Sequence, residues 1–226
     1  MEIDDVPAVM EVERQSFTMP WPGNAYRREL RENRLARYIV ARRTGPPLAG
    51  ERRDYAHRDG QAAAPSGLRG LINWLAEALG VPVDRPLQPV DLSRRVVGYA
   101  GLWLMVDEAH VTSIAVAPAY RGLGIGELLF IGLIDIARAV GAQYMTLEVR
   151  ASNQLAQNLY KKYGFKETGV RRRYYSDNNE DALIMWSDPI DSPGFRRMVE
   201  EHRQALVERL RSPRTLAALQ SRAAQT

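Results

Sequence analysis

A strand that runs directly into a helix through a glycine-rich turn is the feature that most constrains the fold of this 226-residue chain. Residues 114–117 are apolar, and Gly122, Gly124 and Gly126 follow before a strongly apolar helical segment. Glycines let the backbone approach a ligand closely. Free N–H groups at a helix N-terminus attract phosphate, and Arg121 adds a positive charge beside them. The turn therefore predicts a phosphate site; a turn that is simply flexible is the alternative.

The spacing of these glycines excludes two common nucleotide-binding loops. A dinucleotide-binding turn needs the pattern G-x-G-x-x-G, and the P-loop needs Gly-Lys followed by Ser or Thr. Neither pattern occurs between Tyr120 and Glu127. The turn therefore indicates another class of phosphate-binding protein.

The hydrophobic pattern along the rest of the chain predicts a mixture of helices and strands. We expect helices over 7–18, 24–32, 126–140, 153–163 and 195–211, and strands over 38–41, 96–106, 111–116, 143–149, 167–174 and 181–187. Residues 44–95 interrupt this order. A linker rich in Gly, Pro and Ala runs to about residue 66, and apolar residues at helical spacing then predict a helix over 68–80.

The composition excludes several kinds of chemistry. Cysteine is absent, which excludes disulfides, thiolate nucleophiles, Cys-ligated zinc and iron–sulfur clusters. His57, His110 and His202 lie far apart without ligand-like spacing, so we expect no metal site. No apolar run approaches the roughly 18 residues of a membrane span, and residues 1–10 show no signal-peptide pattern. We expect a cytoplasmic protein without a membrane partner.

A net charge of +4 raises the hypothesis that the protein binds nucleic acid, but the excess of basic residues is spread thinly along the chain. Only Arg171–Arg173 forms a dense basic cluster, which is weaker than the basic stripe of a dedicated nucleic-acid binder. We therefore expect no dedicated nucleic-acid binding. The cluster is either a solvated face or an anion contact, ribosomal RNA included.

Several motifs together resemble one enzyme family. The pattern Arg121-x-x-Gly124-x-Gly126 after an apolar strand resembles the acetyl-CoA diphosphate motif of the GCN5-related N-acetyltransferases (GNAT). Further segments resemble the ribosomal-protein alanine N-acetyltransferases of bacteria, the RimI type; they are Ser16–Trp21, Leu147–Asn153, Leu159–Phe165, Arg171–Tyr175 and Glu180–Met185. The resemblance covers about residues 1–43 and 94–188.

The resemblance implies a fold and a domain organisation. The GNAT fold is of the α/β (α+β) class, with a mixed, mostly antiparallel central sheet, helices on both faces and splayed strands that form the acetyl-CoA cleft. The domain would cover residues 1–188, with residues 44–95 as a helical insertion between early strands. Residues 189–226 would form a C-terminal helical extension.

The resemblance also implies the site residues. Glu148 corresponds to the family's general base and Tyr160 to its general acid. Trp21 and Tyr174 would line a peptide groove, although both are residues that a core could equally use. The remaining matches would contact the cofactor: Ile114, Ala115, Val116, Arg121, Gly122, Leu123, Gly124, Ile125, Gly126, Glu127 and Asn153.

The chemistry of acetyl transfer explains these residue types. A protonated amine cannot attack a thioester, so a base must accept a proton. An α-amino group has a pKa of about 7.7–8.0 and lysine one of about 10.4, so a carboxylate of modestly raised pKa suffices for an N-terminus. The N–H of Val116 is our candidate donor to the tetrahedral oxyanion. Because no cysteine is present, we expect direct transfer in a ternary complex.

The predicted function is therefore an acetyl-CoA-dependent transfer of acetyl to a protein N-terminus, an alanine of a small-subunit ribosomal protein. One alternative is a broader N-acetyltransferase that accepts other N-termini, lysines or a small amine. An alternative from another class is a CoA-binding, ribosome-associated module in which catalysis has decayed. The intact Glu148, Asn153 and Tyr160 argue against decay.

Overall fold

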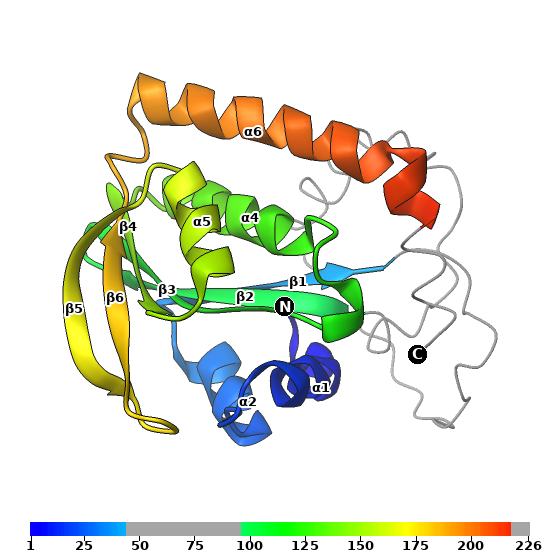
Figure 1. The fold of residues 1–226 in the computed structure, drawn as a ribbon. Helices are drawn as coiled ribbons and strands as arrows, with labels where there is room; N and C mark the ends of the chain where they lie inside the picture. Colours follow the sequence, from blue (N-terminus) through cyan, green and yellow to red (C-terminus); the bar gives the residue numbers. More distant parts are fainter. Residues whose placement is uncertain (44–95, 218–226) are drawn as a thin grey trace.

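A computed structural model describes residues 1–43 and 96–217 of the chain (Figure 1). The helix expected over 68–80 and the rest of the insertion lie outside these residues. The elements are η1 (Ile3–Asp5), α1 (Val6–Ser16), α2 (Gly23–Glu32), β1 (Ala36–Arg42), β2 (Val96–Met105), β3 (Glu108–Val116), η3 (Pro118–Tyr120), α4 (Ile125–Ala139), β4 (Tyr144–Arg150), α5 (Gln154–Lys162), β5 (Lys166–Tyr175), β6 (Glu180–Trp186) and α6 (Pro193–Arg211).

The strands form one sheet of six in the order β1-β2-β3-β4-β6-β5. Neighbours run antiparallel except for β3 and β4, which are parallel. This confirms the mixed, mostly antiparallel sheet. The predicted boundaries differ from the observed ones by up to three residues, and most at β3, which begins at Glu108 because the turn is confined to Val106 and Asp107. Val106 accommodates this tight reversal with a left-handed φ of 57°.

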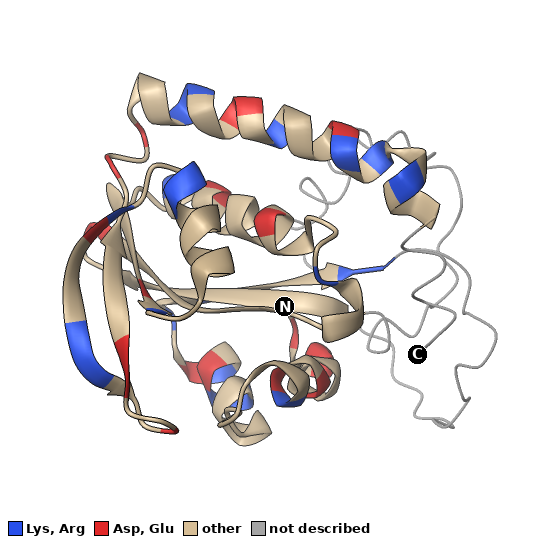
Figure 2. Ribbon diagram, viewed as in Figure 1, with Lys and Arg blue, Asp and Glu red and all other residues tan. Residues whose placement is uncertain are grey.

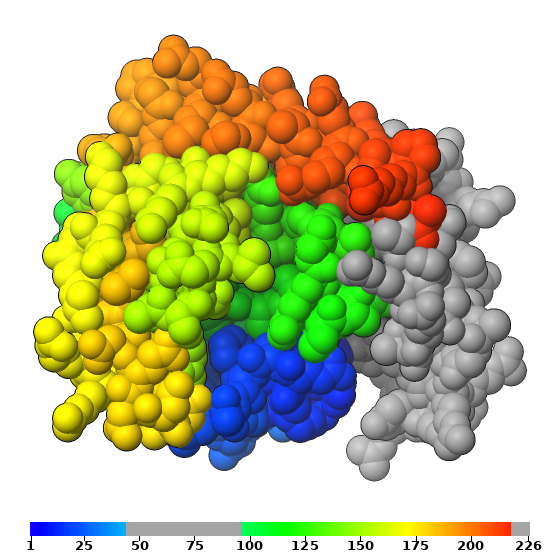
Figure 3. Space-filling view, in the orientation of Figure 1, coloured from blue at the N-terminus to red at the C-terminus, as the bar shows by residue number. Residues whose placement is uncertain are grey.

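The parallel pair separates before either strand ends. Pairing between β3 and β4 stops at Val111 and Leu147, whereas β3 continues to Val116 and β4 continues to Arg150. The ends of the two strands therefore splay apart in the middle of the sheet. The space-filling view shows a hollow on this face, bounded by the yellow-green residues of α5, the green residues that begin α4 and the blue N-terminal helices (Figure 3).

Helices cover both faces of the sheet. The apolar helix α4 packs on one face and α6 lies outside it, while α1 and α2 cover the opposite face (Figure 1). Phe130, Leu133 and Ile134 of α4 are fully buried in the larger core, and Val9 of α1 anchors the smaller one. Figure 2 shows basic and acidic positions interspersed along α1, α2 and α6. None of the helices within 1–43 and 96–217 is both long and apolar enough to cross a bilayer.

The C-terminal helix is part of the main core and does not form a separate unit. Phe195, Val199 and Leu206 of α6 are each at most 5% exposed and join the cluster built by α4 and the sheet. The expected boundary at residue 188 therefore separates two stretches of sequence that share one core.

Replacement of Phe195 by Ala is expected to lower the free energy of unfolding by about 3 kcal/mol, because it removes a buried aromatic ring and leaves a cavity. Urea denaturation followed by circular dichroism measures the change. Glu208→Ala, at an exposed position of the same helix, is the control and should change stability by less than about 0.5 kcal/mol. A small effect of Phe195→Ala would show that α6 does not contribute to the core.

Candidate active site

The turn between β3 and α4 leaves N–H groups free at the N-terminus of α4. The helix α4 begins at Ile125, with Gly124 as its N-cap residue at a φ of 88°. Within the described ranges, the N–H groups from Gly124 to Glu127 have no hydrogen-bond acceptor. Gly122 has a φ of 77°, and an added Cβ there would meet nothing within 4 Å. These features fit a bound diphosphate, because open space and unpaired donors lie together at a helix N-terminus.

Arg121 braces this turn. Its Nε donates to the Val116 carbonyl at 2.9 Å, and its Nη2 donates to the Ser16 hydroxyl at 3.2 Å. The guanidinium therefore ties the end of β3 to the end of α1 and adds positive charge beside the free N–H groups. The sequence predicted the charge but not the bracing contacts.

The N–H of Val116 faces the gap between β3 and β4. The next residue, Ala117, donates its N–H to the Val97 carbonyl on the β2 side, at 2.9 Å. Because successive N–H groups along a strand point to opposite edges, that of Val116 points away from β2. This direction fits the predicted donor to an oxyanion.

Glu148 lies on β4 just beyond the point where the strands separate, and its side chain is only 6% exposed. His110 Nε2 lies 3.1 Å from its Oε2, and Arg171 Nη2 lies 3.2 Å from its Oε1. The Nδ1 of His110 in turn lies 2.9 Å from the Thr146 hydroxyl. A neutral imidazole that accepts from Thr146 and donates to Glu148 satisfies all of these contacts.

The contacts of Glu148 correct one expectation. We expected a modestly raised pKa, but the hydrogen bond from His110 lowers the pKa of Glu148 below its ordinary value of 4.5. Burial opposes this shift, and the charge of Arg171 adds to it. Glu148 is therefore ionised at neutral pH and accepts a hydrogen bond from the imidazole of His110.

The sequence pattern missed His110 as a partner of Glu148. Parallel register pairs His110 with Thr146, which places Glu148 diagonally across on the same face of the sheet. The signal in the sequence is the matching alternation of polar residues in the two strands. It becomes informative only once β3 and β4 are known to be neighbours.

Tyr160 is positioned by packing. Its ring lies 5.1 Å from that of Phe130 and 6.2 Å from that of Phe165, and the residue is 4% exposed. Burial raises the pKa of its hydroxyl, so Tyr160 stays protonated and can donate. The nearby Tyr175 adds to this shift.

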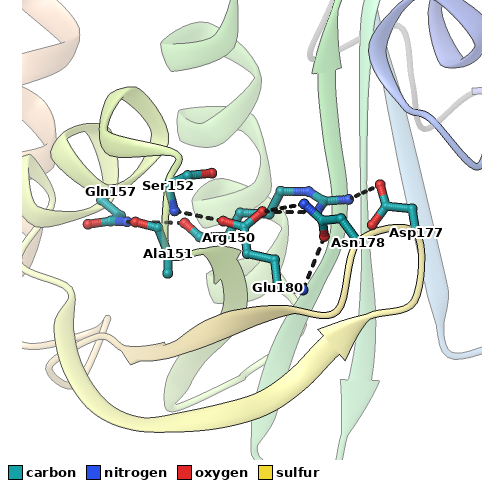
Figure 4. A network of polar contacts seen from close by, with 7 residues as sticks. All are labelled: Arg150, Ala151, Ser152, Gln157, Asp177, Asn178 and Glu180. Carbon is teal, nitrogen blue, oxygen red and sulfur yellow. Dashed lines mark hydrogen bonds and ion pairs between the residues drawn. The ribbon is translucent and has the colours of Figure 1, made fainter.

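The loop after β4 is fixed by a polar network (Figure 4). Arg150 bonds to Asp177 at 2.7 Å and to Glu180 at 3.1 Å, and Glu180 accepts the N–H of Ser152 at 2.8 Å. Gln157 of α5 donates to the carbonyl of Arg150 at 3.1 Å. These bonds tie β4, α5 and the turn between β5 and β6 together.

Asn153 and Glu127 are both predicted cofactor contacts, but the side chain of each forms hydrogen bonds with other residues of the protein. The Asn153 side chain caps α5 by accepting the N–H of Ala156 at 3.1 Å. The carboxylate of Glu127 is bound by Lys162, Arg209 and the hydroxyl of Tyr163. What Glu127 can offer a phosphate is therefore its N–H, because its carboxylate is already engaged.

Trp21 lies on the loop between α1 and α2, and Tyr174 lies at the end of β5, next to the turn that leads into β6. The N–H of Trp21 donates to the buried Glu13 at 2.9 Å, and its ring, 40% exposed, packs beside Tyr26. Tyr174 is 45% exposed, and burial first and the nearby charge of Glu148 second raise the pKa of its hydroxyl. The Ser176 hydroxyl lies 3.6 Å from the Met19 sulfur and joins the two loops. Tyr174 thus lies near the predicted base, while Trp21 belongs to the neighbouring aromatic cluster.

A β-bulge near the end of β5 sets the orientation of Tyr174. The pairing of β5 with β6 breaks between Arg171 and Tyr175, and Arg173 adopts a left-handed φ of 51°. A bulge re-aims side chains locally. The Arg171 guanidinium lies 5.6 Å from the Tyr174 ring and also bonds Glu148, so part of the basic cluster belongs to the site.

Comparisons with known proteins agree with this geometry. The profile of the acetyltransferase (GNAT) family matches residues 55–165. A Bacillus subtilis protein, provisionally named a ribosomal protein bS18-alanine N-acetyltransferase, is 33% identical over 186 residues, which is 82% of this chain and 91% of that protein. The Escherichia coli K12 enzyme of that name is 42% identical over 93 residues, which is 40% of this chain and 63% of the enzyme.

Solved structures give the same result. The crystal structure of the ribosomal-protein-S18-alanine N-acetyltransferase from Escherichia coli matches with a TM-score of 0.58 and 26% identity, and the match covers 86% of this chain and 93% of that one. Ard1 from Thermoplasma volcanium matches with a TM-score of 0.54 and 20% identity, over 82% of this chain and 92% of that one, and supports the fold alone.

Proposed function

This chain belongs to the GNAT family and is an N-acetyltransferase, and we propose that it transfers acetyl from acetyl-CoA to the α-amino group of a protein N-terminus. The acceptor that its relatives favour is the N-terminal alanine of ribosomal protein bS18, because the B. subtilis and E. coli proteins are named for that reaction. The observation that carries the proposal is the position of Glu148, which is buried with His110 where β3 and β4 part.

The turn before α4 supports acetyl-CoA as the acetyl donor. The N–H groups from Gly124 to Glu127 would hold the diphosphate, since they point out of the N-terminus of a helix and have no acceptor in the described residues. The open space at Gly122 would let the diphosphate approach the backbone closely. The gap between the ends of β3 and β4 would then receive the thioester.

Residues of this chain would supply each proton transfer. The amine nitrogen attacks the thioester carbon, a C–N bond forms and the C–S bond breaks. Glu148 would accept the proton that the amine loses, directly or through water, and His110, which donates to this carboxylate, would hold it in place. The N–H of Val116 would stabilise the oxyanion, and Tyr160 would give its proton to the departing thiolate.

The electrostatics of the site favour an N-terminal acceptor. A carboxylate of lowered pKa is a weak base, so it suits an amine that is already partly neutral. About 10% of α-amino groups are neutral at pH 7, against well under 0.1% of lysine side chains. The exposed Met19, Trp21 and Tyr174 would contact the first residues of the acceptor chain.

Acetylation of a panel of peptides tests the proposal. With acetyl-CoA at pH 7, a peptide with a free N-terminal alanine is expected to react about 100-fold faster than an Nα-blocked peptide that carries lysine, because of the difference in neutral amine. Mass spectrometry locates the acetyl group. Acetylation confined to lysine side chains would overturn the N-terminal assignment, and CoA binding without turnover on any acceptor would indicate a decayed module.

A further inference from the structure

The C-terminal helix reaches the turn that begins α4. A Cβ added to Gly124 would lie 2.8 Å from Leu206 Cδ1 and 2.9 Å from Arg209 Nη2. Leu206 is 2% exposed and packs in the main core, so this contact is held in place by the core itself. The last turns of α6 therefore pack directly against Gly124, in the turn that is predicted to bind the diphosphate.

A buried carboxylate lies beneath the same turn. The Glu127 side chain is 8% exposed and belongs to the first turn of α4. It is bound by Arg209 of α6, by Lys162 of α5 and, at 2.9 Å, by the hydroxyl of Tyr163. Burial alone would raise the pKa of Glu127, but these hydrogen bonds outweigh burial and lower it, so the carboxylate is charged.

This carboxylate poses an electrostatic problem for phosphate binding. An acidic side chain in the first turn of a helix interacts favourably with the helix dipole, as a bound phosphate does, so the two anions compete. They also repel each other at short range in a partly buried place. Lys162 and Arg209 reverse the balance, since one carboxylate between two cations leaves a net positive charge beside the turn.

We propose that Arg209 is a positioning residue for acetyl-CoA: together with Lys162 it outweighs the charge of Glu127, so that the N-terminal turn of α4 can accept the diphosphate. The inference rests on the proposed function, since it concerns the same site. It assigns a role to the helix that follows the catalytic domain: α6 completes the electrostatics of the donor site from a position 82 residues away in the sequence.

Calorimetric titration with CoA and steady-state kinetics on the full chain test this role. Arg209→Ala is expected to raise the dissociation constant of CoA and the KM of acetyl-CoA about 5- to 10-fold, because it lowers the net charge of the group formed by Glu127, Lys162 and Arg209 from positive to zero. We expect kcat and the KM of the acceptor peptide to stay within twofold. Arg209→Lys keeps the charge and should bind CoA like the wild type.

A double variant and a matched control separate this role from simple loss of packing. Glu127→Gln combined with Arg209→Ala removes both charges and should restore CoA binding to within twofold of wild type. Arg203 forms a 2.7 Å ion pair with Asp135 between the same two helices, about two helical turns further along α4. Arg203→Ala is expected to lower the melting temperature without changing CoA binding.

Three results would overturn the inference while leaving the proposed function intact. They are CoA binding that is unchanged in Arg209→Ala, a loss that Glu127→Gln does not restore, and an equal loss in Arg203→Ala. A wild-type chain that fails to bind CoA would instead refute the proposed function and the inference together.

Discussion

Replacement of Glu148 by Gln is expected to lower kcat/KM about 100- to 1000-fold, because the amide cannot accept the proton that the attacking amine releases. The side chain is almost isosteric and can still accept a hydrogen bond from His110, so the splayed ends of β3 and β4 should keep their arrangement. Release of CoA during acetylation of the N-terminal alanine peptide measures the effect. The dissociation constant of CoA should remain within twofold, since Glu148 lies on β4 and not on the diphosphate turn.

The control for this variant is Glu167→Gln, which neutralises an exposed carboxylate on β5 and should leave turnover unchanged. If Glu148→Gln turned over at the wild-type rate, the carboxylate would have no part in proton transfer. The assignment of the base would then pass to another group of the site, with His110 the first to examine.

The pH dependence of the wild-type enzyme follows from the direction of the pKa shift. Because the pKa of Glu148 lies below its ordinary value of 4.5, the carboxylate is ionised throughout the neutral range. Its titration therefore does not change kcat/KM at any pH above 4.5. The value of kcat/KM should therefore rise with pH as the α-amino group of the acceptor loses its proton, with a midpoint of about 7.7–8.0.

Replacement of Tyr160 by Phe is expected to lower kcat about 100-fold, because the CoA thiolate then departs without a proton donor. The ring contacts with Phe130 and Phe165 remain, so the change removes the hydroxyl and little of the packing. The KM values of acetyl-CoA and of the peptide should stay close to those of the wild type.

Tyr144→Phe is the matched control, since Tyr144 begins β4 beside Trp186, at the end of the strand away from the gap. It should retain wild-type kcat. An unchanged kcat in Tyr160→Phe would show that water or another group protonates the thiolate, and it would remove Tyr160 from the reaction.

Local sequence pattern predicted most of the secondary structure. The positions of α4, β4 and α5 follow from periodicity, from Gly124 before α4 and from Asn153 at the start of α5, all of which act over a few residues. The start of β3 was the exception. Two acidic residues suggested a turn, whereas pairing with β2 extends the strand back to Glu108.

Sequence motifs alone identified the groups expected to carry the chemistry: a glycine turn with free N–H groups, a strand-end carboxylate at Glu148 and a helix tyrosine at Tyr160. How these groups act depends on contacts that form only in the folded chain. The parallel register of β3 and β4 places His110 on Glu148 and lowers its pKa, and the docking of α6 places Arg209 on Glu127. These contacts join residues far apart along the chain, and they depend on strand order and helix packing, which local periodicity does not encode.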